Sequence, residues 1–401
     1  MKVAFKGATI IPVEGSIIEN GIMIIENGKI SNIGDSSISI DEAQIIDCSG
    51  TYITPGLIDP HSHVGLFEEG AGMGYGDGNE TTDPITPQLR ALDAILPEDI
   101  GFDDARKGGV TTMGILPGSG NLIGGQAVCI KSYGIMIDDM VVKSPAGVKF
   151  ALGENPRRVY KEMKKSPSTR MASAFLIRQA FYKAMDYRVD WLEYQQKIKK
   201  ENIKPEEERA FIKEPKFDMT LDILLKILSR EIPVRCHSHR ADDIRTAIRL
   251  ADEFGFKLVI DHATESAKIG EYIASRGFPV VVGPLMTSRS KRELKDRSLK
   301  TPGIMMKYGV QVSLTTDAPV IPIYMLRESM IIATREGLPV ESALETITIN
   351  PAKVLGVDDR VGSLKIGKDA DFVIWDDDPM DVRAKAIKTF IDGNLVYEYL
   401  E

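Results

Sequence analysis

The 401-residue chain contains only five histidines, and they fall in three short stretches. His61 and His63 stand two positions apart behind a Pro-Gly pair, and the others occupy positions 237, 239 and 262. Residues two apart on a β-strand point to the same side, so both imidazoles of the first pair can reach one ligand. Imidazole nitrogen binds zinc and related divalent metals. An exposed polar strand end would explain the first pair alone, but the three stretches together predict a metal site.

A carboxylate that could complete this site follows another apolar run. Asp317 ends the sequence Val312-Ser-Leu-Thr-Thr-Asp317, and its charge would balance that of a metal. Capping of the next helix is the common alternative role for an aspartate in this position. A metal such as zinc lowers the pKa of bound water from about 15.7 to near 7.

The elements that must position these residues alternate between β-rich runs and helical stretches. Eight runs stand out, at residues 56–61, 110–115, 126–130, 147–151, 233–237, 257–260, 279–282 and 312–315. Eight strands that alternate with helices are typical of a parallel (β/α)8 TIM-like barrel, which places its site at the carboxyl ends of the strands. The histidine stretches fall at such ends. We therefore expect an α/β fold in which a barrel, residues 55–349, carries the metal site.

Both ends of the chain differ from this middle part. Residues 1–54 and 350–401 contain short apolar runs separated by the turn signals Asn20-Gly21, Asn27-Gly28 and Asp392-Gly393. They predict one small β-sandwich domain built from both chain ends. Within the barrel, residues 157–216 carry many charged residues at helical spacing and predict a helical insertion. We expect a solvated excursion there, with a lid or a subunit contact as the alternative.

These motifs together resemble those of metal-dependent amidohydrolases, in the group of imidazolonepropionase-related and prolidase-like enzymes. The resemblance spans nearly the whole chain and rests on residues 54–63, 109–112, 237, 261–262, 316–318 and 361–373. It implies one or two divalent metal ions, zinc before others. The metal ligands that it implies are His61, His63, His237, His262 and Asp317, and Asp317 would also be the general acid and base.

The same resemblance implies a role for Lys149 at the end of the fourth run. Many similar enzymes carry a lysine there whose carbamate bridges two metal ions. A buried cation is costly inside a barrel, whereas a carbamate is an anion that two metals neutralise. Lys149 could instead pair with Glu154 or Asp261, and Lys131 on the third run is a weaker rival for the bridge. Without a bridge, the histidines and Asp317 would hold a single metal.

Substrate contacts are expected from loops at the same end of the barrel. His239 and Arg240 follow the ligand histidine at position 237, and the Arg240 guanidinium could bind a substrate carboxylate. A salt bridge from Arg240 to Asp242 or Asp243 explains that arginine equally well. The glycine-rich segment 68–80 predicts a loop that either closes over the substrate or serves as a flexible connector.

The sequence thus predicts an enzyme, a metal-dependent hydrolase of an amide, cyclic amide or dipeptide C–N bond. A deaminase on the same scaffold and a non-catalytic metal-binding barrel are the alternatives. The net charge of −8 offers no basic face to nucleic acid or anionic lipid. No apolar run approaches the roughly 20 residues of a membrane span. We therefore expect a cytoplasmic homo-oligomer that acts on a small molecule and has no nucleic-acid or membrane partner.

Overall fold

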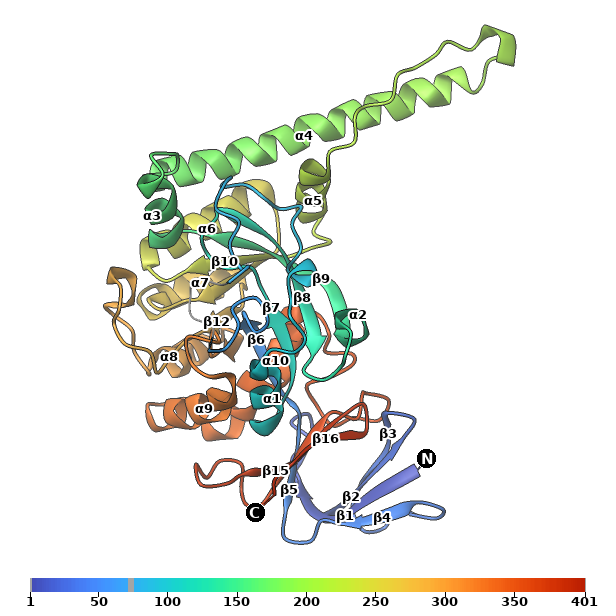
Figure 1. Ribbon diagram of the computed structural model, residues 1–401, viewed down its shortest axis with the longest axis vertical. Helices are drawn as coiled ribbons and strands as arrows, with labels where there is room; N and C mark the ends of the chain where they lie inside the picture. The colour runs from blue at the N-terminus through green and yellow to red at the C-terminus, as the bar shows by residue number, and fades with distance from the viewer. Residues whose placement is uncertain (1, 71–75, 401) are drawn as a thin grey trace.

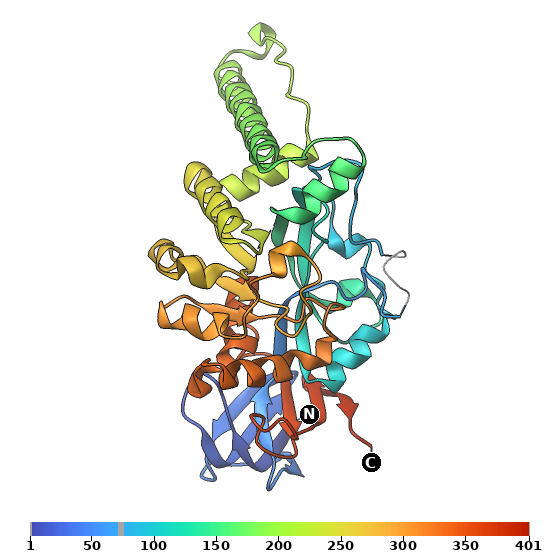
Figure 2. The same ribbon diagram turned by 90° about the vertical axis from the view of Figure 1, so that its left-hand side faces the viewer.

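The computed structural model describes residues 2–70 and 76–400 of the chain. Figure 1 shows three parts along the long axis of the molecule. A sheet built from both chain ends lies at the bottom, a strand barrel with its helices lies in the middle, and a long helical arm projects at the top. Figure 2, turned by 90°, shows the same order of parts, so the arm and the two chain ends lie at opposite ends of the molecule.

Eight strands form the barrel sheet, and each coincides with one of the expected runs. In spatial order they are β6 (Leu57–Ser62), β7 (Val110–Ile115), β8 (Ile123–Lys131), β9 (Val141–Ala151), β10 (Val234–Ser238), β11 (Leu258–His262), β12 (Val280–Val282) and β13 (Val312–Leu314). The expected all-parallel order is wrong at β8, which runs antiparallel to β7 and β9. Only residues 116–122 connect β7 to β8, and a parallel crossover needs a dozen or more residues. Every other neighbouring pair is parallel, so the TIM-like arrangement is otherwise kept.

Side chains close the barrel between its first and last strands. The carboxylate of Asp59 on β6 accepts hydrogen bonds from the Thr315 hydroxyl at 2.7 Å, the Thr316 hydroxyl at 2.6 Å and the Thr316 N–H at 3.0 Å. The carbonyl oxygen of His61 lies 2.6 Å from the same Thr315 hydroxyl, so the two acceptors share its single hydrogen. Because no backbone ladder joins β6 and β13 in the described parts of the chain, the buried Asp59 holds this seam.

Helices pack around the outside of the barrel. They are α1 (Ile100–Lys107), α6 (Ala241–Phe254), α7 (Gly270–Arg276), α8 (Thr301–Lys307) and α9 (Leu326–Arg335), with the short α2 (Ile137–Met140) before β9. The longest of them, α6, buries Ile244, Ala247, Ile248 and Ala251, which share one helical face. Gly255 ends it in the left-handed conformation, φ 75°, which a glycine adopts at little cost.

One further helix, α10 (Ile349–Leu355), lies almost wholly within the range expected for the small domain. Its residues Ala352 and Leu355 nevertheless pack with Ile58 and Cys129 of the barrel strands. Short 3-10 helices complete the connections: η2 (Ala91–Asp93), η3 (Glu206–Glu208), η4 (Ser266–Ile269), η5 (Arg292–Leu294), η6 (Ile323–Met325), η7 (Val340–Ser342) and η8 (Leu344–Ile347).

Both chain ends contribute to a second eight-stranded sheet. Its strands are β1 (Lys2–Ile10), β2 (Ile18–Glu26), β3 (Lys29–Gly34), β4 (Gln44–Asp47), β5 (Tyr52–Pro55), β14 (Phe372–Trp375), β15 (Ala386–Ile391) and β16 (Asn394–Glu398). They join in the order β16-β15-β14-β5-β1-β2-β3, with β4 also on β1. The rings of Phe5, Phe372 and Phe390 pack together in its core. Since hydrogen bonds link all eight strands into one sheet, the two-sheet form of the predicted sandwich is not confirmed.

Two of the three expected turns in this sheet are confirmed. Asn27-Gly28 and Asp392-Gly393 each join two antiparallel strands, and all four residues have positive φ. Asn20-Gly21 is not a turn, because it lies inside β2 at an irregularity of the β1–β2 pairing. A side chain at Gly21 would meet Ile10 Cδ1 at 2.7 Å, so close packing explains that glycine.

The region of the expected helical insertion forms the arm. It contains α3 (Glu154–Glu162) and the 32-residue α4 (Arg170–Glu201), and the chain returns to α5 (Met219–Leu228). The first half of α4 buries Ile177, Phe181 and Ala184, whereas its second half projects beyond the barrel. Within the described residues, no helix combines the length and the apolar character that crossing a membrane requires.

Candidate active site

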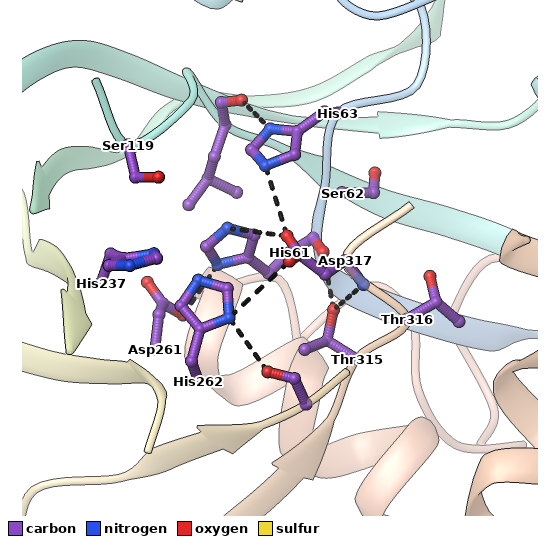
Figure 3. A network of polar contacts seen from close by, with 12 residues as sticks. His61, Ser62, His63, Ser119, His237, Asp261, His262, Thr315, Thr316 and Asp317 are labelled. Atoms are coloured by element: carbon purple, nitrogen blue, oxygen red, sulfur yellow. Dashed lines mark hydrogen bonds and ion pairs between the residues drawn. The ribbon is translucent and has the colours of Figure 1, made fainter. Parts of the chain in front are cut away.

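All five histidines converge at the carboxyl ends of β6, β10 and β11. The ring centres of His61 and His262 lie 4.7 Å apart, and those of His237 and His262 lie 4.3 Å apart. Every one of the five side chains is buried. Figure 3 shows His61, His63 and His262 next to the carboxylate of Asp317, with His237 beyond them. The structure therefore brings together the three stretches that the sequence pattern singled out.

Asp317 lies among these rings. One carboxylate oxygen is 3.3 Å from His63 Nε2 and 3.8 Å from His61 Nε2, and the other is 3.9 Å from His262 Nδ1. Burial would raise the pKa of this carboxyl, but His262, His63 and Lys149 outweigh burial and hold the pKa below its usual value. The side chain is therefore an anion at neutral pH.

The backbone that presents Asp317 is strained. Asp317 and His262 both adopt left-handed conformations, with φ of 56° and 69°, which residues other than glycine adopt at a cost. The N–H of Asp317 donates to Thr315 Oγ1 at 3.0 Å, and Thr315 is bound in turn to Asp59. The barrel seam thus holds the turn that aims the Asp317 carboxylate at the histidines.

Lys149 reaches the same cluster from β9. Its Nζ lies 2.9 Å from His61 Nε2, and the side chain is fully buried. Burial, opposed by Asp261 and Asp317, lowers the pKa of Lys149 to about 8. The rival Lys131 is elsewhere: it pairs with Asp371 at 2.6 Å, at the junction with the second sheet. Of the two lysines considered, only Lys149 lies at the histidines.

The orientation of the rings suits a metal. Nδ1 of His63 lies 2.7 Å from the Leu116 carbonyl oxygen, and Nδ1 of His262 lies 2.9 Å from that of Gly283. Carbonyl oxygens only accept, so both Nδ1 atoms donate, and in a neutral ring Nε2 is then the nitrogen whose lone pair can bind a metal. Nε2 of His237 and of His262 are buried without a hydrogen-bond partner in the described structure. Such orphaned nitrogens fit a bound metal ion.

Two overlapping groups of side chains offer ligand atoms within 4.8 Å of one another, namely His237, His239 and His262, and His61, His262 and Asp317. Burial is the main cause that lowers the pKa of His61, His237 and His262 well below the usual value. A neutral imidazole is the form that binds a metal. Histidine nitrogen with one carboxylate is a donor set typical of zinc.

A buried ion pair supports the cluster and was not predicted as part of the site. Arg235 on β10 donates to both oxygens of Asp261, at 2.6 and 3.2 Å, and to the Pro60 carbonyl at 3.0 Å. Asp261 lies 3.2 Å from His61 Nδ1. This contact turns the other ring nitrogen of His61 toward Lys149. The sequence signal that could have indicated this ion pair was an arginine inside an apolar strand run.

A cavity of about 560 Å³ opens onto the cluster. Its lining consists of His63, Phe67, Glu68, Glu69, Gly70, Asn79, Gly118, Ser119, Asn155, His237, His262, Lys291, Asp317, Pro319 and Val320. Lys291 is the one cationic side chain in this lining. It pairs at 2.7 Å with the buried Glu293, which also lies 3.5 Å from His237 Nε2. Neither residue was predicted, because the stretch Arg289-Ser-Lys-Arg-Glu-Leu-Lys295 reads as an ordinary charged loop.

The two expected substrate-binding residues differ in their placement. His239 is buried beside His262, with ring centres 4.6 Å apart, and its Nδ1 lies 2.7 Å from Thr264 Oγ1. Arg240 forms a two-point ion pair with Asp242 at 2.9 and 3.1 Å. This is the salt bridge that the sequence left open, and it turns Arg240 into a second cavity instead of the first.

The glycine-rich segment 68–80 borders the first cavity. Glu68, Glu69, Gly70 and Asn79 line it, and Asn79 Oδ1 accepts a hydrogen bond from the Gly120 N–H at 2.7 Å. Residues 71–75 of this segment lie outside the described residues. Closure of the segment over a substrate therefore stays a prediction.

Comparisons with known proteins agree with this geometry. A model of the amidohydrolase family matches residues 222–397. The chain is 29% identical to amidohydrolase tasK of Hapsidospora irregularis over 94% of its own length, but it spans only 40% of tasK. It is 24% identical to an imidazolonepropionase of Rhizobium rhizogenes, with 90% and 87% of the two chains covered. A solved amidohydrolase structure from Thermotoga maritima MSB8 is similar with a TM-score of 0.91 and 43% identity, over 99% of this chain and 100% of that one.

Proposed function

The chain belongs to the metal-dependent amidohydrolase superfamily, whose members are hydrolases of carbon–nitrogen bonds, and from this premise we propose that it hydrolyses an amide, cyclic amide or dipeptide bond of a small molecule. The observation that carries the proposal is the placement of Asp317. Its carboxylate lies within 4 Å of nitrogens of His61, His63 and His262, at the mouth of the 560 Å³ cavity. A base in that position reaches both a metal and a substrate.

In the proposed site, His61, His63, His237, His262 and Asp317 hold one or two divalent ions, with zinc the ion that best suits this donor set. A bound metal of this kind activates a water molecule and polarises the substrate carbonyl. The chain's own groups move the proton. Asp317 takes it from the attacking water on one carboxylate oxygen and delivers it to the leaving nitrogen.

Lys149 is the proposed bridge between two metals, as a carbamate on Nζ. Its position supports this role, since Nζ lies 2.9 Å from His61 Nε2 inside the barrel. The described carboxylates nearest to it are already engaged, because Asp261 is paired with Arg235 and Asp317 faces the histidines. An anionic carbamate would therefore join a site that is rich in neutral nitrogen donors.

The proposed substrate is a small molecule with a carboxylate. Lys291 supports this choice, because it is the cation of a cavity whose lining is otherwise apolar, neutral or acidic. The chain is similar to an imidazolonepropionase over most of its length, and we therefore include cyclic amides in the substrate panel beside dipeptides. His239, the second substrate contact expected from the sequence, lies buried between the histidine cluster and Glu293 and does not line this cavity, so we propose that it acts on the substrate through these neighbours.

The test is Asp317→Asn, assayed against a panel of cyclic amides and dipeptides that the unchanged enzyme hydrolyses. We expect kcat to fall by about 100- to 10,000-fold, the range for loss of a general base, while circular dichroism and the melting temperature show a folded protein. Asp186→Asn, at an exposed position on α4, is the matched control and should keep full activity.

The products identify the reaction. New carboxylate supports hydrolysis of an amide, cyclic amide or dipeptide, with or without ammonia, whereas stoichiometric ammonia without new carboxylate would assign a deaminase instead. Unchanged turnover in Asp317→Asn would contradict the mechanism, because no other described carboxylate lies as close to both His61 and His63.

A further inference from the structure

A second cavity, of about 350 Å³, lies beside the active site. It is lined by Glu154, Arg157, Arg170, Arg240, Arg292 and Glu293. Four guanidiniums and two carboxylates leave this lining with a formal charge of +2. Such a gathering of arginines is unexpected in a chain whose net charge is −8.

The two cavities share their walls but no lining residue. Asn155 and Lys291 line the first cavity, whereas their chain neighbours Glu154 and Arg292 line the second. Glu293 separates the two: it lines the second cavity, and its carboxylate accepts a hydrogen bond from the Glu154 N–H at 3.1 Å and lies 3.6 Å from His239 Nε2. A ligand in the second cavity would therefore be distinct from the substrate, yet only one side chain away from the histidines.

Half of the arginine charge is already compensated inside the protein. Arg170 makes a two-point ion pair with Asp243 at 2.7 and 2.9 Å, and Arg240 makes one with Asp242. A guanidinium carries five N–H donors, so each of these two retains donors for another partner. Their side chains are 39% and 33% exposed, which leaves them accessible from the cavity.

The other two arginines have no anionic partner. Neither Arg157 nor Arg292 forms an ion pair with any described residue, and Arg157 donates only to the Ser168 carbonyl oxygen, at a long 3.4 Å. Against them stands one unpaired carboxylate, Glu154, because Glu293 is paired with Lys291. The cavity thus holds an excess of free guanidinium donors.

We propose that this cavity binds a small oxyanion, a carboxylate or phosphate group of a metabolite other than the substrate, through Arg157 and Arg292 with Arg170 and Arg240 in support. Guanidinium forks match the geometry of carboxylate and phosphate oxygens. The volume of the cavity restricts the ligand to a small molecule. Binding there does not depend on the proposed hydrolase activity, so the two proposals can fail separately.

The test is isothermal titration calorimetry of the metal-loaded full chain with two probes, inorganic phosphate and succinate, at constant ionic strength set by chloride. We expect both to bind, and Arg157→Met/Arg292→Met to weaken that binding at least about tenfold, the effect of losing 1.4 kcal/mol. The control Arg335→Met/Arg383→Met removes two exposed arginines that do not line the cavity and should bind as the unchanged protein does. Tighter binding of one probe assigns the phosphate or the carboxylate class.

Two results would overturn the proposal. One is the absence of binding of either probe to the unchanged protein. The other is binding at full strength in the double variant, which would place the anion at the metal or in the first cavity. If the double variant does not fold, Arg292→Met alone replaces it. The Arg292 side chain is exposed and without an ion pair in the described structure, so its loss removes no internal contact. For the proposal to stand, Arg292→Met must still bind phosphate or succinate more weakly than the unchanged protein does.

Discussion

Burial sets the protonation states of the individual site residues. It is the largest cause that lowers the pKa of His61, His237 and His262, and it lowers that of Lys149 to about 8. Neutral imidazoles and a neutral amine are the forms that bind a metal and react with carbon dioxide, respectively. Asp317 remains an anion, because His262, His63 and Lys149 outweigh its desolvation, and Lys149 with a pKa of about 8 is still mostly cationic at pH 7. The folded chain therefore favours the metal-binding forms of His61, His237, His262 and Asp317, and it gives Lys149 a larger neutral fraction than an exposed lysine has.

The role of Lys149 can be tested through metal content. Lys149→Ala, purified without chelator and with bicarbonate present, should hold about one metal ion per chain where the unchanged protein holds about two, because the bridging anion is lost. The measurement is plasma mass spectrometry of each protein. Added formate or acetate should restore part of the second equivalent by placing a carboxylate in the vacated space. Lys161→Ala on α3 is the control. About one metal ion per chain in all three proteins would assign a single-metal site without the carbamate, and about two in all three would show that the second ion does not need Lys149.

The role of Lys291 can be tested through substrate choice. Lys291→Met should raise KM by about 10- to 100-fold for a substrate with a free carboxylate, which corresponds to one charged hydrogen bond. For the same substrate with its carboxylate capped as a carboxamide, Lys291→Met should change KM only slightly. Lys295→Met, exposed on the same segment, should change neither value. A fall in kcat with both substrates would instead show that Lys291 acts by holding Glu293 near His237.

At the scale of elements, the strand runs and histidine clusters could be predicted because periodicity and residue type are local properties. The direction of β8 could not, since it depends on the short connection from β7 rather than on the strand itself. Arg240 shows the same limit at a loop: its neighbours Asp242 and Asp243 made the salt bridge foreseeable, but only the fold decides which cavity the side chain enters. Lys291 carried no local signal, because its place at the cavity depends on Glu293, which lies near the distant His237 and His239.

The outer part of the arm, residues 188–217, is predicted to be dispensable for folding. Tyr187 and Asp218 meet at its base, where the Asp218 N–H lies 3.4 Å from the Tyr187 hydroxyl. A short Gly-Ser linker can therefore replace residues 188–217. Because Ile177, Phe181 and Ala184 remain packed, the melting temperature should shift by less than about 3 °C, and kcat/KM should stay within about twofold.

The same deletion tests the alternative roles of the arm. Ile203 and Phe211 are 85% and 90% exposed in this structure. Size-exclusion chromatography with light scattering should give the same subunit number before and after the deletion. A smaller assembly would assign the arm as the contact of the expected homo-oligomer, and an intact assembly with lost activity would assign it as a lid.

At the scale of the whole molecule, a buried ion cluster joins the barrel to the second sheet. Lys131 of β8 lies 2.6 Å from Asp371, 2.9 Å from Asp369 and 3.2 Å from Asp392, all three in the C-terminal segment. Lys131, Asp369 and Asp371 are almost fully buried. Burial, together with Asp392 and against Lys131, raises the pKa of Asp371 to about 6. Stability of the contact between the two parts should therefore depend on both Lys131 and pH.

The direction in which stability changes with pH follows from the raised pKa of Asp371. In the unfolded chain Asp371 has a pKa near 3.9, so the folded state binds its proton more tightly and loses stability as the pH rises from about 4 to about 6. Lys131→Met removes the central cation, which raises the pKa of Asp371 further and extends the loss to higher pH. Urea unfolding should show that Lys131→Met lowers the free energy of unfolding by about 3–5 kcal/mol at pH 8 and by clearly less at pH 5.

The control is Lys29→Met, which removes a half-exposed partner of the same Asp369 and should lower the free energy of unfolding by no more than about 1 kcal/mol. An equal cost of the two substitutions, or a cost of Lys131→Met that is independent of pH, would show that the junction is held by apolar packing instead of by these charges.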